Sequence, residues 1–329
     1  KGPRDQLLSP LQSVCGIVEK RHTLPILSNV LMEKDGEKLT LLATDIEIQI
    51  TTRTPTIGAE KAAMTVGARK LQDILRSLPE SAEVSLALED KRLQLKAGKS
   101  RFNLQTLPAE DFPRMSAADG QSTRLLITQK KMKRLLGLVQ YAMAQQDIRY
   151  YLNGLLLVAK GKELRMVATD GHRLAYAAEM LDDAPAPIEV ILPRKTVLEL
   201  SRQLADSDEP LEITLTPTQA RFSFGGIELV SKLIDGKFPD YERVIPQHHS
   251  KLIKLSRNTL LHSLLRAAIL TNEKFRGVRL VLGAGSLKII SSNAEQEEAQ
   301  EEIEVDYGGE VLDVGFNVTY LLDVLNNVG

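Results

Sequence analysis

The chain has 329 residues, of which 43% are hydrophobic, and a formal net charge of −1 at pH 7. This length exceeds what one hydrophobic core usually serves, so we expect several domains. The single cysteine, Cys15, cannot form an internal disulfide, and the longest apolar runs are too short to cross a bilayer. These features exclude a disulfide-built scaffold and a helical membrane protein, and they favour a cytoplasmic location.

One seven-residue pattern occurs three times along the chain. LTLLATD at 39–45 returns as LRMVATD at 164–170 and more loosely as LKIISSN at 287–293, at offsets of 125 and 123. A second marker, 67–70, corresponds to 192–195 and 316–319, and Phe112-Pro113 corresponds to Phe238-Pro239. Repeats of this length are whole domains, because solenoid and propeller repeats are far shorter. We therefore predict three domains, at 1–117, 118–245 and 246–329, with the third incomplete at its C-terminal end.

The predicted elements follow the same order in each repeat. In chain order, helix-period segments lie at 5–21, 69–78, 128–144, 193–204, 256–270 and 318–328. Thr128 and Ser256 are candidate N-caps, whereas Pro10 predicts a late start or a kink in the first helix. Between the helices the hydrophobic period is two, as at 46–51 and 84–88, which predicts half-buried strands. Nothing before the first helix resembles 125–128, so we expect the first domain to lack its first strand.

These patterns predict an α+β fold in three tandem domains. Each domain is expected to contain two helices among roughly eight strands, with the helices packed on antiparallel sheets.

The charge is divided unevenly between helices and the rest of the chain. The six predicted helices carry +9 together, and the remainder carries −10. For any one helix, a solvated charged face is the preferred interpretation. Five helices with almost no acidic residues favour an electropositive surface that binds phosphate. No base-reading motif is present, so such binding would be independent of sequence and sensitive to salt.

A second asymmetry separates the first repeat from the third. The first carries basic residues at Lys91, Arg92, Lys96, Lys99 and Arg101, while the third carries an acidic run at 295–304. Two unrelated solvated edges would explain this equally well. The alternative is a head-to-tail contact between two copies of the chain, which closes into a ring or continues as a filament. Phe102, Leu104, Ile269 and Leu270 are the candidate apolar partners within it.

Catalytic interpretations have weak support in the sequence. Asp170 and His172 suggest a hydrolase, but no nucleophile motif accompanies them. His248-His249 is more typical of a polar linker than of a metal site, and no calcium-loop pattern is present in the acidic run. We expect no enzyme activity, cofactor or metal.

Six runs of residues resemble the beta sliding clamps of bacterial DNA polymerase III. They are TLPIL at 23–27, DIRYYLNG at 147–154, ATDGHRL at 168–174, FPDY at 238–241, NEKFRGV at 272–278 and GFNV at 315–318. They occur in collinear order along the whole chain. The resemblance implies three clamp domains per protomer, a ring-shaped homodimer around duplex DNA with helices lining the hole, and a role as processivity factor for the replicative polymerase.

The resemblance also assigns roles to individual residues. It implies DNA contact for Arg21, Arg69, Lys70, Gln146, Tyr150, Tyr151, Arg194 and Lys195. It implies a peptide-binding cleft between the second and third domains, formed by Arg149, Leu152, Thr169, Gly171, His172, Arg173, Leu174, Pro239, Arg243, Val244, Asn317 and Tyr320. The resemblance also implies that the two charged edges form the dimer interface. Its residues are Lys70, Arg92, Lys99, Arg101, Phe102, Leu104, Ile269, Leu270, Glu295, Glu297, Glu298 and Glu301.

The implied partners are duplex DNA, a second copy of the chain, and proteins that carry a short Gln/Leu/Phe-type peptide. Those proteins are the polymerase alpha subunit, the clamp-loader delta subunit, other polymerases, and mismatch-repair and ligase proteins. The alternative is a monomeric or filament-forming scaffold of three repeats whose basic helices have no role on DNA.

Overall fold

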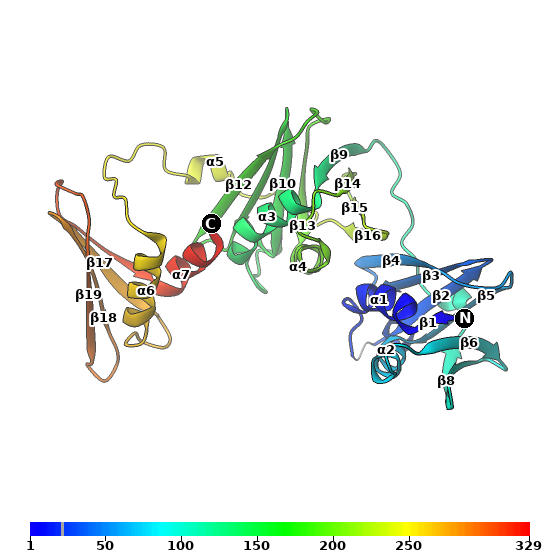
Figure 1. Cartoon of the computed structure of the whole chain (residues 1–329). Coiled ribbons are helices and arrows are strands. Elements are labelled where there is room, and N and C mark those ends of the chain that lie inside the picture. The colour runs from blue at the N-terminus through cyan, green and yellow to red at the C-terminus, as the bar shows by residue number, and fades with distance from the viewer. Residues whose placement is uncertain (21–22) are drawn as a thin grey trace. The chain divides into compact units, whose positions relative to one another are not determined.

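The computed structural model describes residues 1–20 and 23–329, so Arg21 lies outside the described residues. The chain forms two compact units, Lys1–Phe238 and Pro239–Gly329 (Figure 1). No helix among the described residues is long and apolar enough to cross a membrane. The three predicted domain ranges stay predictions.

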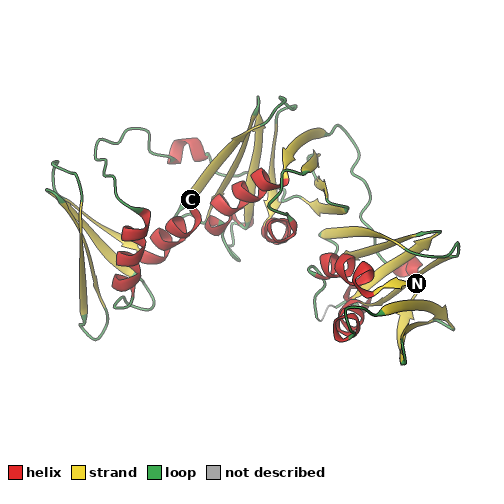
Figure 2. Cartoon of the chain, in the orientation of Figure 1, coloured by secondary structure: helices red, strands yellow, loops and turns green. Residues whose placement is uncertain are grey.

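Each repeat contains two principal helices and antiparallel strands, coloured red and yellow in Figure 2. The first repeat comprises β1 (Gly2–Pro3), α1 (Arg4–Cys15), η1 (Pro25–Ser28), β2 (Asn29–Asp35), β3 (Lys38–Thr44), β4 (Ile48–Pro55), β5 (Lys61–Gly67), α2 (Ala68–Ser77), β6 (Glu83–Glu89), β7 (Arg92–Ala97), β8 (Ser100–Leu107) and η2 (Ala109–Asp111).

The second and third repeats follow the same order. The second comprises β9 (Thr123–Thr128), α3 (Gln129–Val139), η3 (Gln140–Ala142), η4 (Tyr150–Leu152), β10 (Gly154–Lys160), β11 (Glu163–Thr169), β12 (Leu174–Met180), β13 (Ile188–Pro193), α4 (Arg194–Gln203), β14 (Pro210–Leu215), β15 (Gln219–Phe224) and β16 (Ile227–Lys232). The third comprises α5 (Tyr241–Val244), α6 (Arg257–Ala268), β17 (Gly277–Gly283), β18 (Ser286–Ser292), β19 (Glu298–Glu304), β20 (Leu312–Asn317) and α7 (Val318–Asn327). The predicted α+β fold is confirmed.

Local capping signals place two helix starts as predicted. The Thr128 hydroxyl accepts the Lys131 amide at 3.3 Å, and the Ser256 hydroxyl accepts the Thr259 amide at 3.4 Å. The first helix is shorter than predicted, because it ends at Cys15 and not near residue 21.

The prediction that Pro10 delays the first helix is wrong, since α1 already begins at Arg4 and includes Pro10. Proline has no amide to donate to the carbonyl of Gln6, four residues earlier. The Thr54 hydroxyl donates to that carbonyl at 2.7 Å and satisfies it from the neighbouring sheet. A tertiary contact therefore compensates for the missing helical bond.

Strand β4 joins the first two repeats into one twelve-stranded sheet. It pairs with β3 on one side and with β16 on the other. In the pairing with β16, Ile50 lies opposite Leu229. The predicted half-buried strand at 46–51 is wrong, because Gln49 and Thr51 are also buried, at 7% and 5% exposure. The Met115 amide donates to the Gln49 side chain at 2.8 Å on the face that the pattern predicts to be exposed. A single sequence segment cannot reveal this partner.

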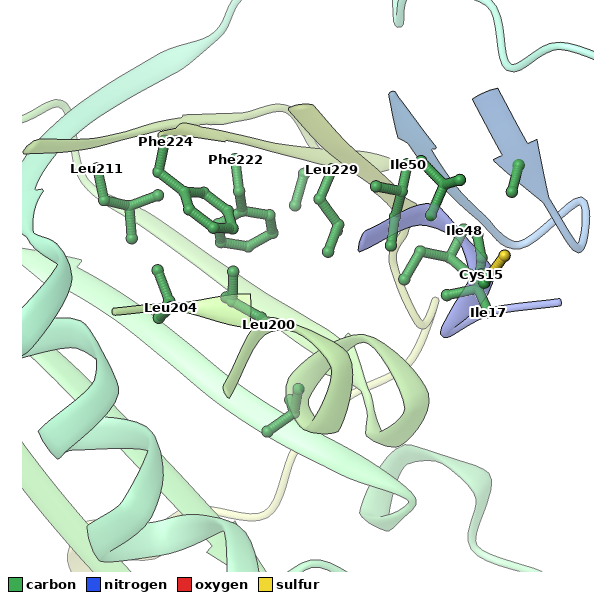
Figure 3. Close-up of a cluster of buried hydrophobic side chains, with 14 of the residues drawn as sticks. Cys15, Ile17, Ile48, Ile50, Leu200, Leu204, Leu211, Phe222, Phe224 and Leu229 are labelled. Atoms are coloured by element: carbon green, nitrogen blue, oxygen red, sulfur yellow. The ribbon is translucent and has the colours of Figure 1, made fainter. Parts of the chain in front are cut away.

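A hydrophobic core runs continuously across this junction. Figure 3 shows Ile48 and Ile50 of the first repeat beside Leu229, Phe222 and Phe224 of the second. The first two repeats therefore form one compact unit.

The first repeat does have a strand ahead of its first helix, which corrects the expected absence. Gly2 and Pro3 form β1 and pair antiparallel with Val84 and Glu83 of β6. This strand has two residues, whereas β9 at the equivalent place in the second repeat has six.

The unit Pro239–Gly329 has a core of its own. Its sheet has the strand order β19-β18-β17-β20, and α6 and α7 supply Leu264, Ala267 and Val318 to the apolar cluster.

Candidate functional site

A short loop and the start of α4 bring together most of the predicted DNA-contacting residues of the second repeat. The loop is closed by Asn153, whose side chain accepts the Asp147 amide and donates to the Asp147 carbonyl, both at 2.9 Å. The Asn153 carbonyl accepts the Arg194 amide at 3.0 Å, which joins the loop to α4. Gln146 has a positive φ of 56°, and its side chain is exposed.

Tyr150 and Tyr151 form an edge-to-face pair on this loop, with ring centroids 5.7 Å apart. Tyr150 is 57% exposed. Gly236 passes close by, since a Cβ there would lie 3.2 Å from both tyrosines. Packing against this glycine fixes the rings at the surface, where an aromatic face and a hydroxyl are available to a ligand.

The basic residues of the first repeat lie close to those of the second at the junction. Arg69, at the start of α2, donates to the Val18 carbonyl at 2.6 Å. Lys195 forms ion pairs with Asp45 and, at 3.6 Å, with Glu19, the neighbour of Val18. The structure therefore brings Arg69 and Lys195 to adjacent residues of the first repeat, Val18 and Glu19, while Arg194 is half-buried at the start of α4. Lys195 is partly neutralised there, which its sequence context does not indicate.

Helix α3 carries four exposed cations, Lys130, Lys131, Lys133 and Arg134, on either side of the buried Met132. Lys131 and Arg134 approach Glu179 of β12 at 3.5 and 3.8 Å. Lys130 and Lys133 form no ion pair with any residue that the structure describes. Their charges are available to an anionic partner, as the sequence pattern predicts.

The turn after β11 organises the predicted peptide site of the second repeat. The Thr169 hydroxyl donates to the Arg173 carbonyl at 2.6 Å and accepts the Gly171 amide at 3.1 Å. The Asp170 carboxylate accepts the amides of His172 and Arg173. These bonds account for Asp170 as a turn-forming residue and remove the support for a catalytic Asp170–His172 pair.

Arg149 lies over this turn. Its guanidinium makes a bidentate ion pair with Asp147, at 3.0 and 2.8 Å, and donates to the Asp170 carbonyl at 3.3 Å. Hydrogen bonds from the side chain and backbone of Arg149 lower the pKa of Asp147 from 3.8 to about 2. A Cβ at Gly171, where φ is 88°, would lie 2.9 Å from both terminal nitrogens of Arg149. Glycine therefore permits this approach.

The other predicted peptide-site residues of the second repeat differ in accessibility. Arg173 donates to the Tyr141 carbonyl at 2.8 Å and stacks on that ring, while Leu174 is half-buried. Leu152 is only 1% exposed, so it supports the surface from below and does not form part of it.

The unit Pro239–Gly329 holds the remaining predicted peptide-site residues. Pro239 is exposed, and Val244 is 61% exposed, which excludes a core role for Val244. Arg243 pairs with Asp240 at 3.0 Å. Asn317 caps α7 by accepting the Thr319 amide at 2.9 Å, and Tyr320 lies half-buried on the first turn of that helix.

Two sheet edges carry the predicted dimer residues. In the first repeat, β8 pairs with β5 only at Thr106 and Leu107, so its 100–105 segment has one edge without a described partner. Lys99, Arg101 and, on β7, Arg92 are exposed there, and Phe102 and Leu104 are half-buried. Lys70, assigned to both DNA and the dimer, is exposed on α2.

In the third repeat, β19 is the edge strand of its sheet. Glu295, Glu297 and Glu298 are exposed at its start, and Ile269 is 77% exposed with Leu270 half-buried beside it. Glu301 forms an ion pair with Arg266 of the same unit, so its charge is already compensated.

Comparison with known proteins decides the family. Family models of the DNA polymerase III beta subunit match residues 3–116 (N-terminal domain), 126–240 (central domain) and 242–329 (C-terminal domain). The chain belongs to the beta sliding clamps, the DNA polymerase III beta-subunit family. The resemblance stated from the sequence is thereby confirmed, including the interpretation as a non-catalytic processivity factor.

Curated beta sliding clamps are similar over nearly the whole chain. The clamp of Pseudomonas putida is 50% identical, covering 98% of this chain and 88% of its own length. The clamp of Escherichia coli K12 is 46% identical with the same coverage. The crystal structure of the beta subunit from Pseudomonas aeruginosa matches with a TM-score of 0.96 and 48% identity, covering 99% of this chain and 89% of that one. A clamp from that organism, also at TM-score 0.96, was solved bound to griselimycin.

Sequence reasoning missed the acidic partners of the basic site residues. Asp147 orients Arg149, Asp45 and Glu19 pair with Lys195, and Glu179 pairs with the α3 cations. Only the first had a local signal, the Asp-x-Arg spacing at 147–149. The described residues contain no group of His, Cys, Asp and Glu side chains arranged for a metal ion.

Proposed function

We propose that two copies of this chain close into a ring around duplex DNA and tether a replicative polymerase to it. The observation that carries the DNA role is the set of exposed cations on α2, α3 and α4, with Lys130 and Lys133 unpaired among the described residues. Contacts with phosphate alone permit sliding, because no contact depends on base sequence. Enclosure then supplies retention, and the tether raises the local concentration of the polymerase.

The proposed ring closes through the edges of β8 and β19 of different protomers. An edge strand presents unpaired amides and carbonyls that a second strand can satisfy. The exposed side chains near one edge are Lys99 and Arg101, and those near the other are Glu297 and Glu298. Opposite charge favours this head-to-tail pairing over pairing of like edges.

Charge reversal and its rescue test the ring contact. The native chain is expected at twice its protomer mass of 36.4 kDa in analytical ultracentrifugation. Glu297→Lys with Glu298→Lys should raise the dimer dissociation constant, and Lys99→Glu with Arg101→Glu in a mixed second chain should restore dimers. The matched change Asp182→Lys with Asp183→Lys, at exposed residues away from both edges, should have no effect.

The monomeric or filament-forming scaffold is the competing outcome. Native protein that sediments as a monomer at micromolar concentration, or as a concentration-dependent series, would favour the scaffold and contradict the ring.

We also propose that the surface around Gly171 receives the short peptide of polymerases, the clamp loader and repair proteins. The turn is held by Thr169 and Asp170, and Arg149 lies above it as a fixed cation. An extended peptide is recognised by such a combination of a few apolar contacts and directed polar groups. The roles of Pro239, Arg243, Val244, Asn317 and Tyr320 in the same site remain predictions from the resemblance.

Two glycine substitutions distinguish a specific effect on this peptide site from the general effect of backbone strain. Gly171→Ala places a Cβ against the Arg149 guanidinium, whereas Gly161→Ala, at a φ of 59°, meets nothing within 4 Å. Both carry the cost of a positive φ. We expect only Gly171→Ala to weaken binding of a labelled Gln/Leu/Phe-type peptide, measured by fluorescence anisotropy. Equal affinities in the two variants would contradict this placement.

A further inference from the structure

The carboxylate of Asp45 is held in place by the backbone of its own turn. Its Oδ1 atom accepts the amides of Glu47 and Ile48 at 2.9 and 2.8 Å. The Asp45 side chain is only 10% exposed. Because the two amides fix Oδ1, the second oxygen, Oδ2, is held in one direction, and it accepts a hydrogen bond from Lys195. The turn therefore presents one fixed anionic oxygen at the junction of the first two repeats.

Lys195 is bound by two acids at this junction. Its ammonium group donates to Asp45 and lies 3.6 Å from a carboxylate oxygen of Glu19. Both acids belong to the first repeat, whereas Lys195 is the second residue of α4 in the second repeat. The Lys195 side chain is still 43% exposed, so an anion in solution can reach its ammonium group.

The equivalent residues of the two repeats do not form this pair. Asp170 holds the place of Asp45 in the second repeat, and its carboxylate pairs with Arg173 of its own turn at 3.2 Å. Lys70 holds the place of Lys195 in the first repeat. It is exposed and forms no ion pair with any residue that the structure describes. The Asp45–Lys195 pair is therefore a feature of this junction and not a requirement of the repeated fold.

A DNA phosphate and Asp45 compete for the same ammonium group. Lysine carries a point charge on a flexible stem, so it can move from one oxygen anion to another while the carboxylate stays fixed. When Lys195 moves to a phosphate, Asp45 regains its negative charge, and the partly buried carboxylate loses its partner. The gain from the phosphate contact is reduced by this loss.

We propose that Asp45 is a positioning residue that weakens DNA binding at the junction by holding Lys195. Lys195 exchanges between Asp45 and a phosphate as the chain moves along a duplex, and Glu19 is a second, more exposed acceptor. This inference rests on the proposed DNA role of Lys195. It identifies the residue that keeps one phosphate contact weak enough for sliding.

The test measures binding of the whole chain to a short labelled DNA duplex by fluorescence anisotropy at a series of salt concentrations. Asp45→Asn removes the charge and keeps an oxygen that can accept both turn amides, so the melting temperature should stay within a few degrees. The affinity should rise about fivefold at about 0.1 M salt. The slope of log affinity against log salt should steepen by about one, because one more counterion is released.

A second variant and two controls separate this exchange from a general loss of negative charge. Glu19→Gln leaves the turn intact and should change affinity in the same direction by a smaller factor. Glu47→Gln removes a charge two residues from Asp45, from a carboxylate that pairs with Lys232 at 3.6 Å, and should leave the slope unchanged. Asp45→Asn should have no effect on DNA binding when Lys195 is already replaced by alanine, because the two residues act as a pair.

The experiment distinguishes a failure of this inference from a failure of the proposed function. If the native chain binds DNA in a salt-dependent way and folded Asp45→Asn binds identically, the exchange is overturned while the DNA role stands. An equal effect of Asp45→Asn in the native and Lys195→Ala backgrounds would overturn it as well. If neither the native chain nor Asp45→Asn shows salt-dependent binding, the proposed DNA role fails, and the inference fails with it.

Discussion

Ile46 and Gly171 occupy equivalent positions in the first two repeats and share a left-handed backbone, with φ of 80° and 88°. The surrounding turns are also equivalent. Thr44 and Asp45 make the same hydrogen bonds around Ile46 that Thr169 and Asp170 make around Gly171. The hydrogen bonds of the turn thus hold this residue at a positive φ, whether it is isoleucine or glycine. The isoleucine is strained in this conformation, whereas glycine is not.

Relief of this strain should be measurable. Ile46→Gly is expected to raise the free energy of unfolding by about 1 kcal/mol, because Ile46 is 38% exposed and little packing is lost. Ile57 provides the control, because it is 69% exposed and its φ is not in the left-handed region. Ile57→Gly should lower the free energy of unfolding, because glycine loses more backbone entropy on folding. Urea unfolding of both variants measures the difference. Destabilisation in both would show that Ile46 is not strained.

The Asp147–Arg149 pair predicts an unusual titration. Because Arg149 lowers the pKa of Asp147 to about 2, the stabilising contact is fully present above the ordinary aspartate range and is lost as pH falls through about 2. NMR titration of the Asp147 carboxyl should give this low pKa, and Arg149→Ala should return it toward 3.8. A native pKa near 4 would exclude the bidentate pair in solution.

Cys15 should be unreactive in the folded protein. Burial raises the pKa of its thiol from 9.0 to about 11, so little thiolate forms at pH 8, and the side chain is 5% exposed. A thiol reagent should label it only after denaturation. Ser9→Cys, at an exposed position of the same helix, should add one equivalent of rapid labelling. Fast reaction of the native chain would mean that α1 opens readily.

The cations of α3 should contribute directly to DNA binding. Lys130→Glu with Lys133→Glu should weaken binding to duplex DNA regardless of its sequence and reduce the slope of log affinity against log salt by about two. Lys160→Glu with Lys162→Glu makes the same charge change on the exposed β10–β11 turn and should leave the slope unchanged. Identical slopes for both double variants would argue against phosphate contacts by α3.

Local features of this fold were predictable, and distant ones were not. Thr128 and Ser256 act within three residues, so their capping role is visible in the sequence. The Gln49 side chain is bonded by the Met115 amide, 66 positions along the chain, and Lys195 meets Asp45 across 150 positions. The periodicity of one segment carries no information on such partners. It therefore predicts a half-buried strand where both faces are covered, and an available cation where the lysine is ion-paired.

The same limit applies to charge. The basic character of α3 was evident from composition, whereas Glu179 faces Lys131 and Arg134 only because β12 packs beside that helix. The triplicate repeat was the informative long-range signal, because it placed equivalent turns, caps and strands in all three domains.

Enclosure of DNA is the central claim, and loading on a nicked circle followed by cutting tests it most directly. The chain is loaded by the clamp loader, free protein is removed by gel filtration, and the circle is then cut once. A ring held by topology should stay with the intact circle and dissociate through the ends of the linear product. Retention on the linear DNA equal to that on the circle would identify a groove-binding protein and contradict the ring.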